Sequence, residues 1–273
     1  MLESKEFYSA LLSPVDLPTL NYFIRQGYSH ELLFWLFTDS VRETVAGHTF
    51  EYRNRASRPC EMVLGHERCF DDLVDVAVGS GLTVETQAIA AGGGRGARAV
   101  HARFCFDSVL AERARKEYSE DIQAKLFGTI AGHRPRCGTW LQAGKKENPN
   151  GETDTLTFDV LGTPYGPIRY QIITRSTFGI YQFLGQILAE QASDTIRLRG
   201  RNAGDEDTRI LAIERGHVGG ACFVELTFEG ESYCVPEQGA HQTKRIFSLL
   251  VQLLALKTPN ADLAITPTVR VTP

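Results

Sequence analysis

Strand-like segments that follow one another across very short turns constrain the fold of this chain most. Residues 155–160 and 168–174 are separated by a turn at 162–166, and residues 221–228 and 231–235 meet at Glu229-Gly230. Strands joined by turns this short pair antiparallel. Because no regular strand–helix–strand repeat runs along the chain, the predicted fold class is α+β, with mixed or antiparallel sheets and packed helices. Further strands are predicted at 82–89, 99–106 and 208–214, and at 263–271, where Pro267 restricts the strand to a sheet edge.

Helical periodicity dominates the first fifty residues. Ser13-Pro14-Val15-Asp16 is a helix-start signal, and apolar residues then recur at helical spacing as far as Gly27. Ser29 can cap a second helix, at 29–43, which is so apolar that it should be buried on more than one side. The two helices predict an N-terminal helical hairpin over a sheet. The other predicted helices are 70–78, 108–128 capped by Asp107, 180–191 capped by Ser176, and 242–256 with Phe247, Leu250, Val251 and Leu254 on one face.

A loop at 143–153, which holds glycine, proline and asparagine, is the best candidate for a boundary. It divides the chain into an N-terminal helical and α+β part, 1–145, and a C-terminal α+β part, 152–273; one continuous domain is the alternative. The hydrophobic fraction of 42% is sufficient for a packed core. The longest apolar run, 247–256, falls far short of the roughly 20 residues of a membrane span, so a soluble chain is expected.

Nucleic-acid binding is not expected from the charge. The net charge is −4, whereas a nucleic-acid-binding domain carries a clustered basic face. The one compact basic run, Arg197, Arg199 and Arg201, alternates with Ile196 and Leu198. This alternation predicts a strand that buries its apolar face and turns its arginines to solvent.

Six cysteines are an even number, which permits disulfides without requiring them. Cys60 and Cys69 have the most bridge-like spacing, whereas Cys105 and Cys222 are interpreted as small buried hydrophobic residues. The redox state depends on the compartment and stays open. Zinc is considered because imidazole and thiolate are its ligands, but no Cys-x-x-Cys motif is present and chance spacing is favoured. The pairs with suitable spacing are His66 with Cys69, His101 with Cys105 and His133 with Cys137.

No complete catalytic constellation is present. The glycines at 92–96 suggest a phosphate-binding loop, but a strand follows instead of a helix, so a hairpin link is favoured. Ser176 lies at a strand-to-helix turn, yet Thr174 and Phe178 replace the glycines of a nucleophile elbow, and a helix cap is favoured. Arg175 beside it is a candidate anion-binding residue. We therefore assign no catalytic residue, no metal ligand and no cofactor, and leave cofactor-binding residues unknown.

Three segments carry a resemblance to known proteins. The first comprises Leu11-Leu12-Ser13-Pro14-Val15-Asp16 with 21–28 and 31–37, the second is 174–185, and the third is 244–256. Together they are similar to a group of uncharacterised proteins of Gram-negative bacteria that are often labelled lipoproteins. Members of that group commonly carry an upstream segment with a lipid-attachment cysteine, which is absent from this sequence. The resemblance therefore implies the globular part of a longer, periplasmic-side envelope protein, and it assigns no catalytic residue.

The leading hypothesis is a non-enzymatic binding or assembly module of the bacterial cell envelope. It implies a protein partner, no nucleic acid, and membrane association only through an N-terminal lipid anchor that the sequence lacks. The helices at 29–43 and 242–256 would supply an interface if exposed, although core burial is favoured for both. One alternative is a cytoplasmic enzyme or nucleotide-linked regulator whose site gathers Arg175, Ser176 and a histidine. Another is a subunit of a larger bacterial defence or secretion complex. Residues 1–6 lack the features of a secretory signal, which fits a cytoplasmic protein or a trimmed N-terminus.

Overall fold

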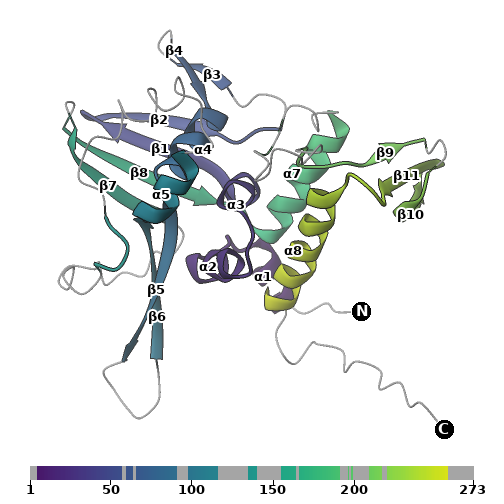
Figure 1. Ribbon diagram of the computed structural model, residues 1–273, viewed down its shortest axis with the longest axis horizontal. Helices are drawn as coiled ribbons and strands as arrows, with labels where there is room; N and C mark the ends of the chain where they lie inside the picture. The colour runs from purple at the N-terminus through teal and green to yellow at the C-terminus, as the bar shows by residue number, and fades with distance from the viewer. Residues whose placement is uncertain are drawn as a thin grey trace.

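The computed structural model describes residues 5–56, 60–63, 66–90, 98–115, 135–139, 155–163, 166–190, 196, 198, 209–216 and 220–257. Within these ranges the fold belongs to the predicted α+β class, with helices packed on antiparallel sheets (Figure 1). None of the helices in these ranges has both the length and the hydropathy of a membrane-spanning segment. The predicted features at 92–96, 143–153 and 263–271, and the second half of the helix at 108–128, lie outside the described residues.

A four-stranded antiparallel sheet with the strand order β2-β1-β8-β7 forms the largest sheet (Figure 1). β7 (Thr155–Thr163) and β8 (Gly166–Thr174) are the two predicted strands. β1 (Thr38–Val45) and β2 (His48–Arg53) form a second hairpin, and β1 pairs with β8. The sheet therefore combines strands from before residue 145 with strands from after residue 152.

Three smaller antiparallel units accompany this sheet. The predicted strands β5 (Leu82–Ala90) and β6 (Arg98–Phe106) pair with each other, as do β3 (Cys60–Val63) and β4 (His66–Cys69). β10 (Cys222–Phe228) and β11 (Glu231–Pro236) form the predicted hairpin. At their turn Glu229 and Gly230 both have positive φ, 50° and 82°, as a type I′ turn requires. β9 (Glu214–Arg215) pairs with the other side of β11 and is all that the described residues show of the strand predicted at 208–214.

Side-chain caps begin three of the predicted helices. Ser29 accepts a hydrogen bond from the amide of Leu32 at 3.2 Å, and Ser176 accepts one from the amide of Gly179 at 3.0 Å. Asp107 likewise accepts hydrogen bonds from two amides of the first turn of its helix. The three predicted caps are therefore confirmed. The helices are α1 (Lys5–Leu12), α2 (Leu17–Arg25), α3 (His30–Phe37), α4 (Phe70–Gly79), α5 (Ser108–Arg115), α7 (Thr177–Ala189) and α8 (His241–Lys257).

The N-terminal region is less helical than its sequence predicts. The helix predicted at 29–43 ends at Phe37, and the chain continues as β1 and β2. The apolar run up to Phe37 conceals this boundary, whereas the β-branched residues after it favour a strand. α2 also starts later than the signal at 13–16 suggests, because Asp16 is the cap and accepts a hydrogen bond from the amide of Thr19. α2 and α3 still pack together as the predicted helical hairpin.

One main hydrophobic core joins the helices to the sheets. It contains Phe23 of α2, Phe37 of α3 and Ile172 of β8, all fully buried. The prediction of which face of α8 is buried is partly wrong, because Val251 is 67% exposed. The sequence of α8 is apolar around most of its circumference, so periodicity does not select the buried face. The residues that α8 does bury are Thr243, Ile246, Leu249, Leu250 and Leu253.

Candidate functional site

The outer strand β10 is exposed along nearly its whole length. It lies at the edge of the β10-β11-β9 sheet, and Figure 1 shows this sheet at one end of the molecule, beyond α7 and α8. Val224, Leu226 and Phe228 alternate along the strand and therefore share one face of the sheet. Leu226 is 52% exposed and Phe228 is 60% exposed. We call these three side chains the β10 surface.

The hairpin that carries the β10 surface is fixed at both ends. The disulfide Cys222–Cys234 joins the start of β10 to β11, and the type I′ turn closes the other end. Val235, which lies opposite Val224, packs into a small buried cluster with Ala212 and Ala240. The β10 surface therefore adjoins a buried cluster, and the strand that carries it is held in a fixed conformation.

The edge strands of the four-stranded sheet carry charged pairs that β10 lacks. On β2, Glu51 accepts a hydrogen bond from Arg53 at 3.0 Å, and on β7, Asp159 accepts one from Arg169 at 2.8 Å. Charged side chains on an edge strand discourage pairing with another chain. β10 has one charged residue, Glu225, among its seven. Of these strands, β10 is the one whose chemistry favours the addition of a further strand.

A hollow with a volume of about 310 Å³ lies at the start of β10. Two of its lining residues are glutamates, Glu214 of β9 and Glu237 just after β11, and the amide of Glu237 donates a hydrogen bond to the carbonyl oxygen of Ala221. We call it the acidic hollow. Its lining is Glu214, Gly220, Ala221, Cys234, Pro236, Glu237 and Gln238.

All six cysteines are paired. The bridge between Cys60 and Cys69, which has the most bridge-like spacing, is present across β3 and β4. Cys105 is fully buried, as its interpretation as a small buried hydrophobic residue predicts, whereas Cys222 is only half-buried, and the two form disulfides with Cys137 and Cys234. Their apolar surroundings indicate burial, but spacing does not reveal which distant cysteine lies alongside. Three disulfides are typical of a protein that matures in an oxidising compartment.

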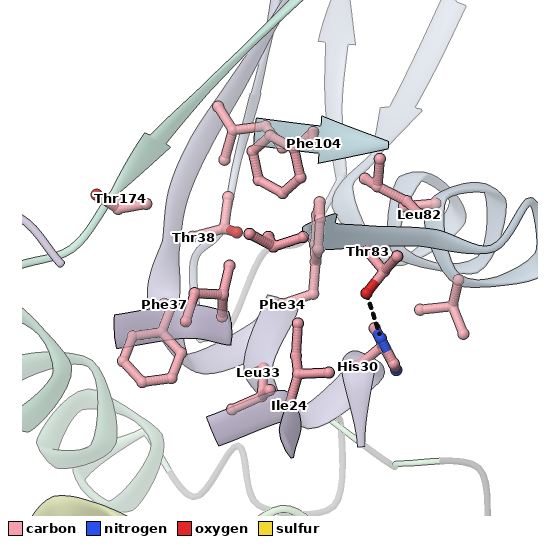
Figure 2. A pocket seen from close by; sticks show the side chains of 15 residues that line it. Ile24, His30, Leu33, Phe34, Phe37, Thr38, Leu82, Thr83, Phe104 and Thr174 are labelled. Atoms are coloured by element: carbon pink, nitrogen blue, oxygen red, sulfur yellow. Dashed lines mark hydrogen bonds between the residues drawn. The ribbon is translucent and has the colours of Figure 1, made fainter. Parts of the chain in front are cut away.

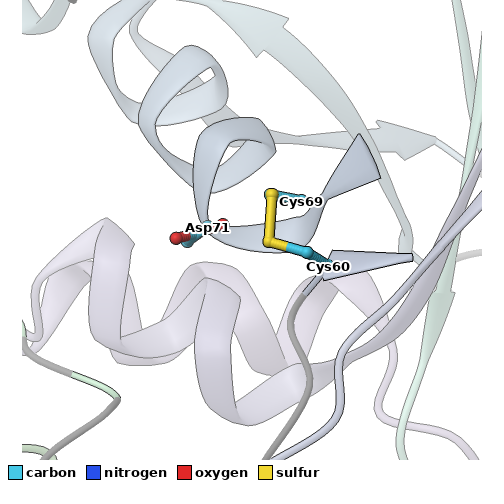
Figure 3. A group of neighbouring side chains, drawn as sticks. All are labelled: Cys60, Cys69 and Asp71. Carbon is cyan, nitrogen blue, oxygen red and sulfur yellow. A yellow bond between two sulfur atoms is a disulfide. The ribbon is translucent and has the colours of Figure 1, made fainter. Parts of the chain in front are cut away.

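Two groups of potential metal ligands contain these disulfide sulfurs. Asp71 lies beside the Cys60–Cys69 bridge (Figure 3), and Glu85 lies beside the Cys105–Cys137 bridge. Zinc binds thiolates, and a sulfur that is bonded to another sulfur is not one, so neither group supplies those ligands while its bridge is intact. The side chains of the histidines that the sequence pairs with these cysteines, His66, His101 and His133, lie outside the described set.

Arg175 is buried, and its guanidinium serves the fold. It donates hydrogen bonds to four backbone carbonyl oxygens at distances of 2.5–3.3 Å, and it stacks on the ring of Phe183 with 3.9 Å to the ring centroid. Burial lowers the pKa of Arg175 to about 10, and the nearby negative charge of Asp39 partly counteracts this effect. The guanidinium is therefore charged at neutral pH. The candidate anion-binding role does not fit, because the donors point at the backbone. The acceptors belong to Trp35, Leu36, Thr38 and Asn54.

Arg175 and Ser176 do not form the site that a cytoplasmic enzyme would need. Ser176 uses its hydroxyl as the cap of α7, and the neighbouring Arg175 side chain is buried against α3. The backbone at Ser176 forms a bridge with Pro14. Serine and arginine are thus adjacent in the chain, but their polar atoms are engaged in holding helices.

Two small apolar cavities lie between α3, α4 and the neighbouring strands. Each has a volume of about 30 Å³, and they share Phe34 and Leu82. Figure 2 shows the first, where Nε2 of His30 and Oγ1 of Thr83 lie 3.0 Å apart. A space of this size accommodates about one water molecule, whereas ligand pockets are roughly 300–1,000 Å³. We interpret both cavities as packing gaps.

Comparison with known proteins found no matching family model, no matching curated protein and no matching solved structure.

Proposed function

We propose that this chain is a non-enzymatic protein-binding module of the bacterial cell envelope and that its partner binds at β10. One observation supports the binding role, namely an apolar edge strand that is exposed on a hairpin fixed by a disulfide. Edges of this kind promote uncontrolled association unless another chain covers them. The three disulfides and the resemblance of three segments to envelope lipoproteins support the location.

The helices considered from sequence are weaker candidates for the interface. α3 buries Leu32, Leu33 and Leu36 in the core, in line with the favoured expectation. α8 also buries one face, and its exposed residues are on a helix, whose backbone groups are not available to pair with another strand. β10 instead offers backbone groups for hydrogen bonding together with apolar side chains, which are the two elements of strand-addition interfaces.

Site-specific photocrosslinking in the native host tests the proposal. A photoreactive residue replaces Thr227 on β10 or, as the control, the exposed Val251 on α8. We expect a covalent adduct with one identified envelope protein from position 227 only, and we expect Leu226→Lys to abolish it. The same adduct from both positions, or an adduct that survives Leu226→Lys, would contradict the proposal.

Leu226→Lys is suitable for this test because it should not unfold the protein. The Leu226 side chain is half exposed, so the change removes little buried area. We expect its free energy of unfolding in urea to stay within about 0.5 kcal/mol of the unsubstituted protein. A larger loss would mean that the β10 surface stabilises the isolated chain and is not free for a partner.

A further inference from the structure

We infer that the partner adds to β10 as an extended strand with alternating apolar residues and with basic residues beside them. This inference rests on the proposed function and specifies the chemistry of the partner at the same strand. The β10 surface presents apolar side chains at every second position, and the complementary strand must therefore place apolar residues at the same period.

The charge of the hairpin determines what must flank those apolar residues. Residues 220–240 contain four glutamates and no lysine or arginine. Glu231 forms an ion pair with Arg215 of β9, whereas Glu225 and Glu229 are exposed at the middle and the turn end of the free edge. A partner strand that runs along β10 thus meets negative charge at the middle and at the turn end of the strand, and basic residues complement it.

The acidic hollow is a specific position at which a basic side chain of the partner could bind. It lies at the opposite end of β10 from the turn, and Glu214 and Glu237 contribute to its lining. The basic side chain of Lys244 lies at this end of β10: its Nζ donates to the backbone oxygen of Glu237, a lining residue, and lies 4.8 Å from the ring centroid of Phe223. Lys244 therefore offsets one of the two negative charges that Glu214 and Glu237 bring to the hollow. The hollow is large enough to admit the basic side chain of a partner residue.

A second copy of this chain is a poorer occupant. Pairing β10 with itself would bring two hairpins together that each carry Glu225, Glu229 and Glu231. Like charges on adjacent strands are destabilising, and repulsion of this kind is a common means of excluding a wrong partner. The charge pattern therefore favours a different, basic chain.

Synthetic peptides and the intact protein test the inference by isothermal titration calorimetry. The probe is a peptide of alternating valine and threonine with a pair of lysines at each end; in the matched control, glutamates replace the lysines. We expect the lysine peptide to bind roughly tenfold more tightly at low salt, and the difference to shrink as salt screens the charges. We expect the Glu214→Gln/Glu237→Gln variant to weaken the lysine peptide roughly threefold or more, and Glu112→Gln on α5 to leave it unchanged.

A third peptide distinguishes strand addition from simple charge attraction. It keeps the lysines and places prolines at alternate positions, so it cannot complete a hydrogen-bonded ladder, and we expect it not to bind. Equal binding by the lysine and glutamate peptides would overturn the basic partner and leave β10 as the binding strand. Binding by the proline peptide, or binding that is insensitive to Leu226→Lys, would overturn strand addition at β10 and with it the proposed function. Self-association of the protein that Leu226→Lys removes would replace the basic partner with a second copy.

Discussion

Arg175→Met is expected to lower the free energy of unfolding by about 3–5 kcal/mol, measured by urea denaturation. The guanidinium of Arg175 supplies donors to the carbonyl oxygens of Trp35 and Leu36, which are at the end of α3. It also donates to the carbonyl oxygens of Thr38, the first residue of β1, and Asn54, just after β2. The last carbonyls of a helix have no partner within the helix. Methionine fills similar space without a donor, so the variant leaves buried acceptors unsatisfied.

Arg169→Met is the matched control for this variant. Arg169 lies on the preceding strand β8, its side chain is 64% exposed, and its ion pair with Asp159 is in solvent. Exposed pairs contribute little, so we expect a loss of less than about 1 kcal/mol. Equal losses for the two variants would contradict the structural role of Arg175. If Arg175→Met does not fold, Arg175→Lys should show an intermediate loss, because one ammonium reaches fewer carbonyls than the guanidinium fork.

The double variant Cys105→Ala/Cys137→Ala is expected to lose about 3–4 kcal/mol of unfolding free energy. This bridge connects residues 32 apart in sequence and anchors the segment 135–139 to β6. Its removal restores the conformational freedom of a long loop to the unfolded chain, and in the chain-entropy account this freedom grows with loop length. Urea denaturation of the oxidised proteins gives the difference.

The Cys60–Cys69 bridge supplies an internal comparison. Its sequence separation is only 9, so the same account predicts a loss about 1 kcal/mol smaller for Cys60→Ala/Cys69→Ala. A larger loss from the short bridge would show that contacts within β3 and β4, and not loop closure, determine its contribution. No loss from the long bridge would show that the segment 135–139 is held to β6 by other contacts.

Local signals in the sequence predict much of this fold. Ser29, Asp107 and Ser176 begin helices because a cap needs only a hydrogen bond to an amide in the next turn. Glu229-Gly230 closes its hairpin because the turn geometry depends on those residues themselves. Ile196 and Leu198 are buried, as their alternation predicts, although neither residue lies in a strand, and the arginines between and after them lie outside the described residues. Each of these features is determined within a few neighbouring residues.

Contacts between distant residues explain what the sequence does not predict. The end of α3 at Phe37 is stabilised by Arg175, which is far away in the chain, and the β-branched residues after Phe37 do not by themselves fix the boundary. The partner of Cys105 depends on where the segment 135–139 lies. The exposure of β10 is likewise concealed, because the alternation of Val224, Leu226 and Phe228 with Glu225 and Thr227 is typical of a strand whose apolar face is buried. The candidate site depends on β10 having no neighbouring strand on its outer side among the described residues, and periodicity carries no information about this.

The most direct test of the account is the redox state of the cysteines in the native host, because the disulfides support both the envelope location and the fixed β10 hairpin. The protein is alkylated at harvest, purified, and measured by intact mass with and without prior reduction. We expect no alkylated thiol before reduction and six after it, since all six cysteines are paired. Six alkylated thiols without reduction would contradict it, because the protein would then reside in a reducing compartment and β10 would have no covalent link to β11.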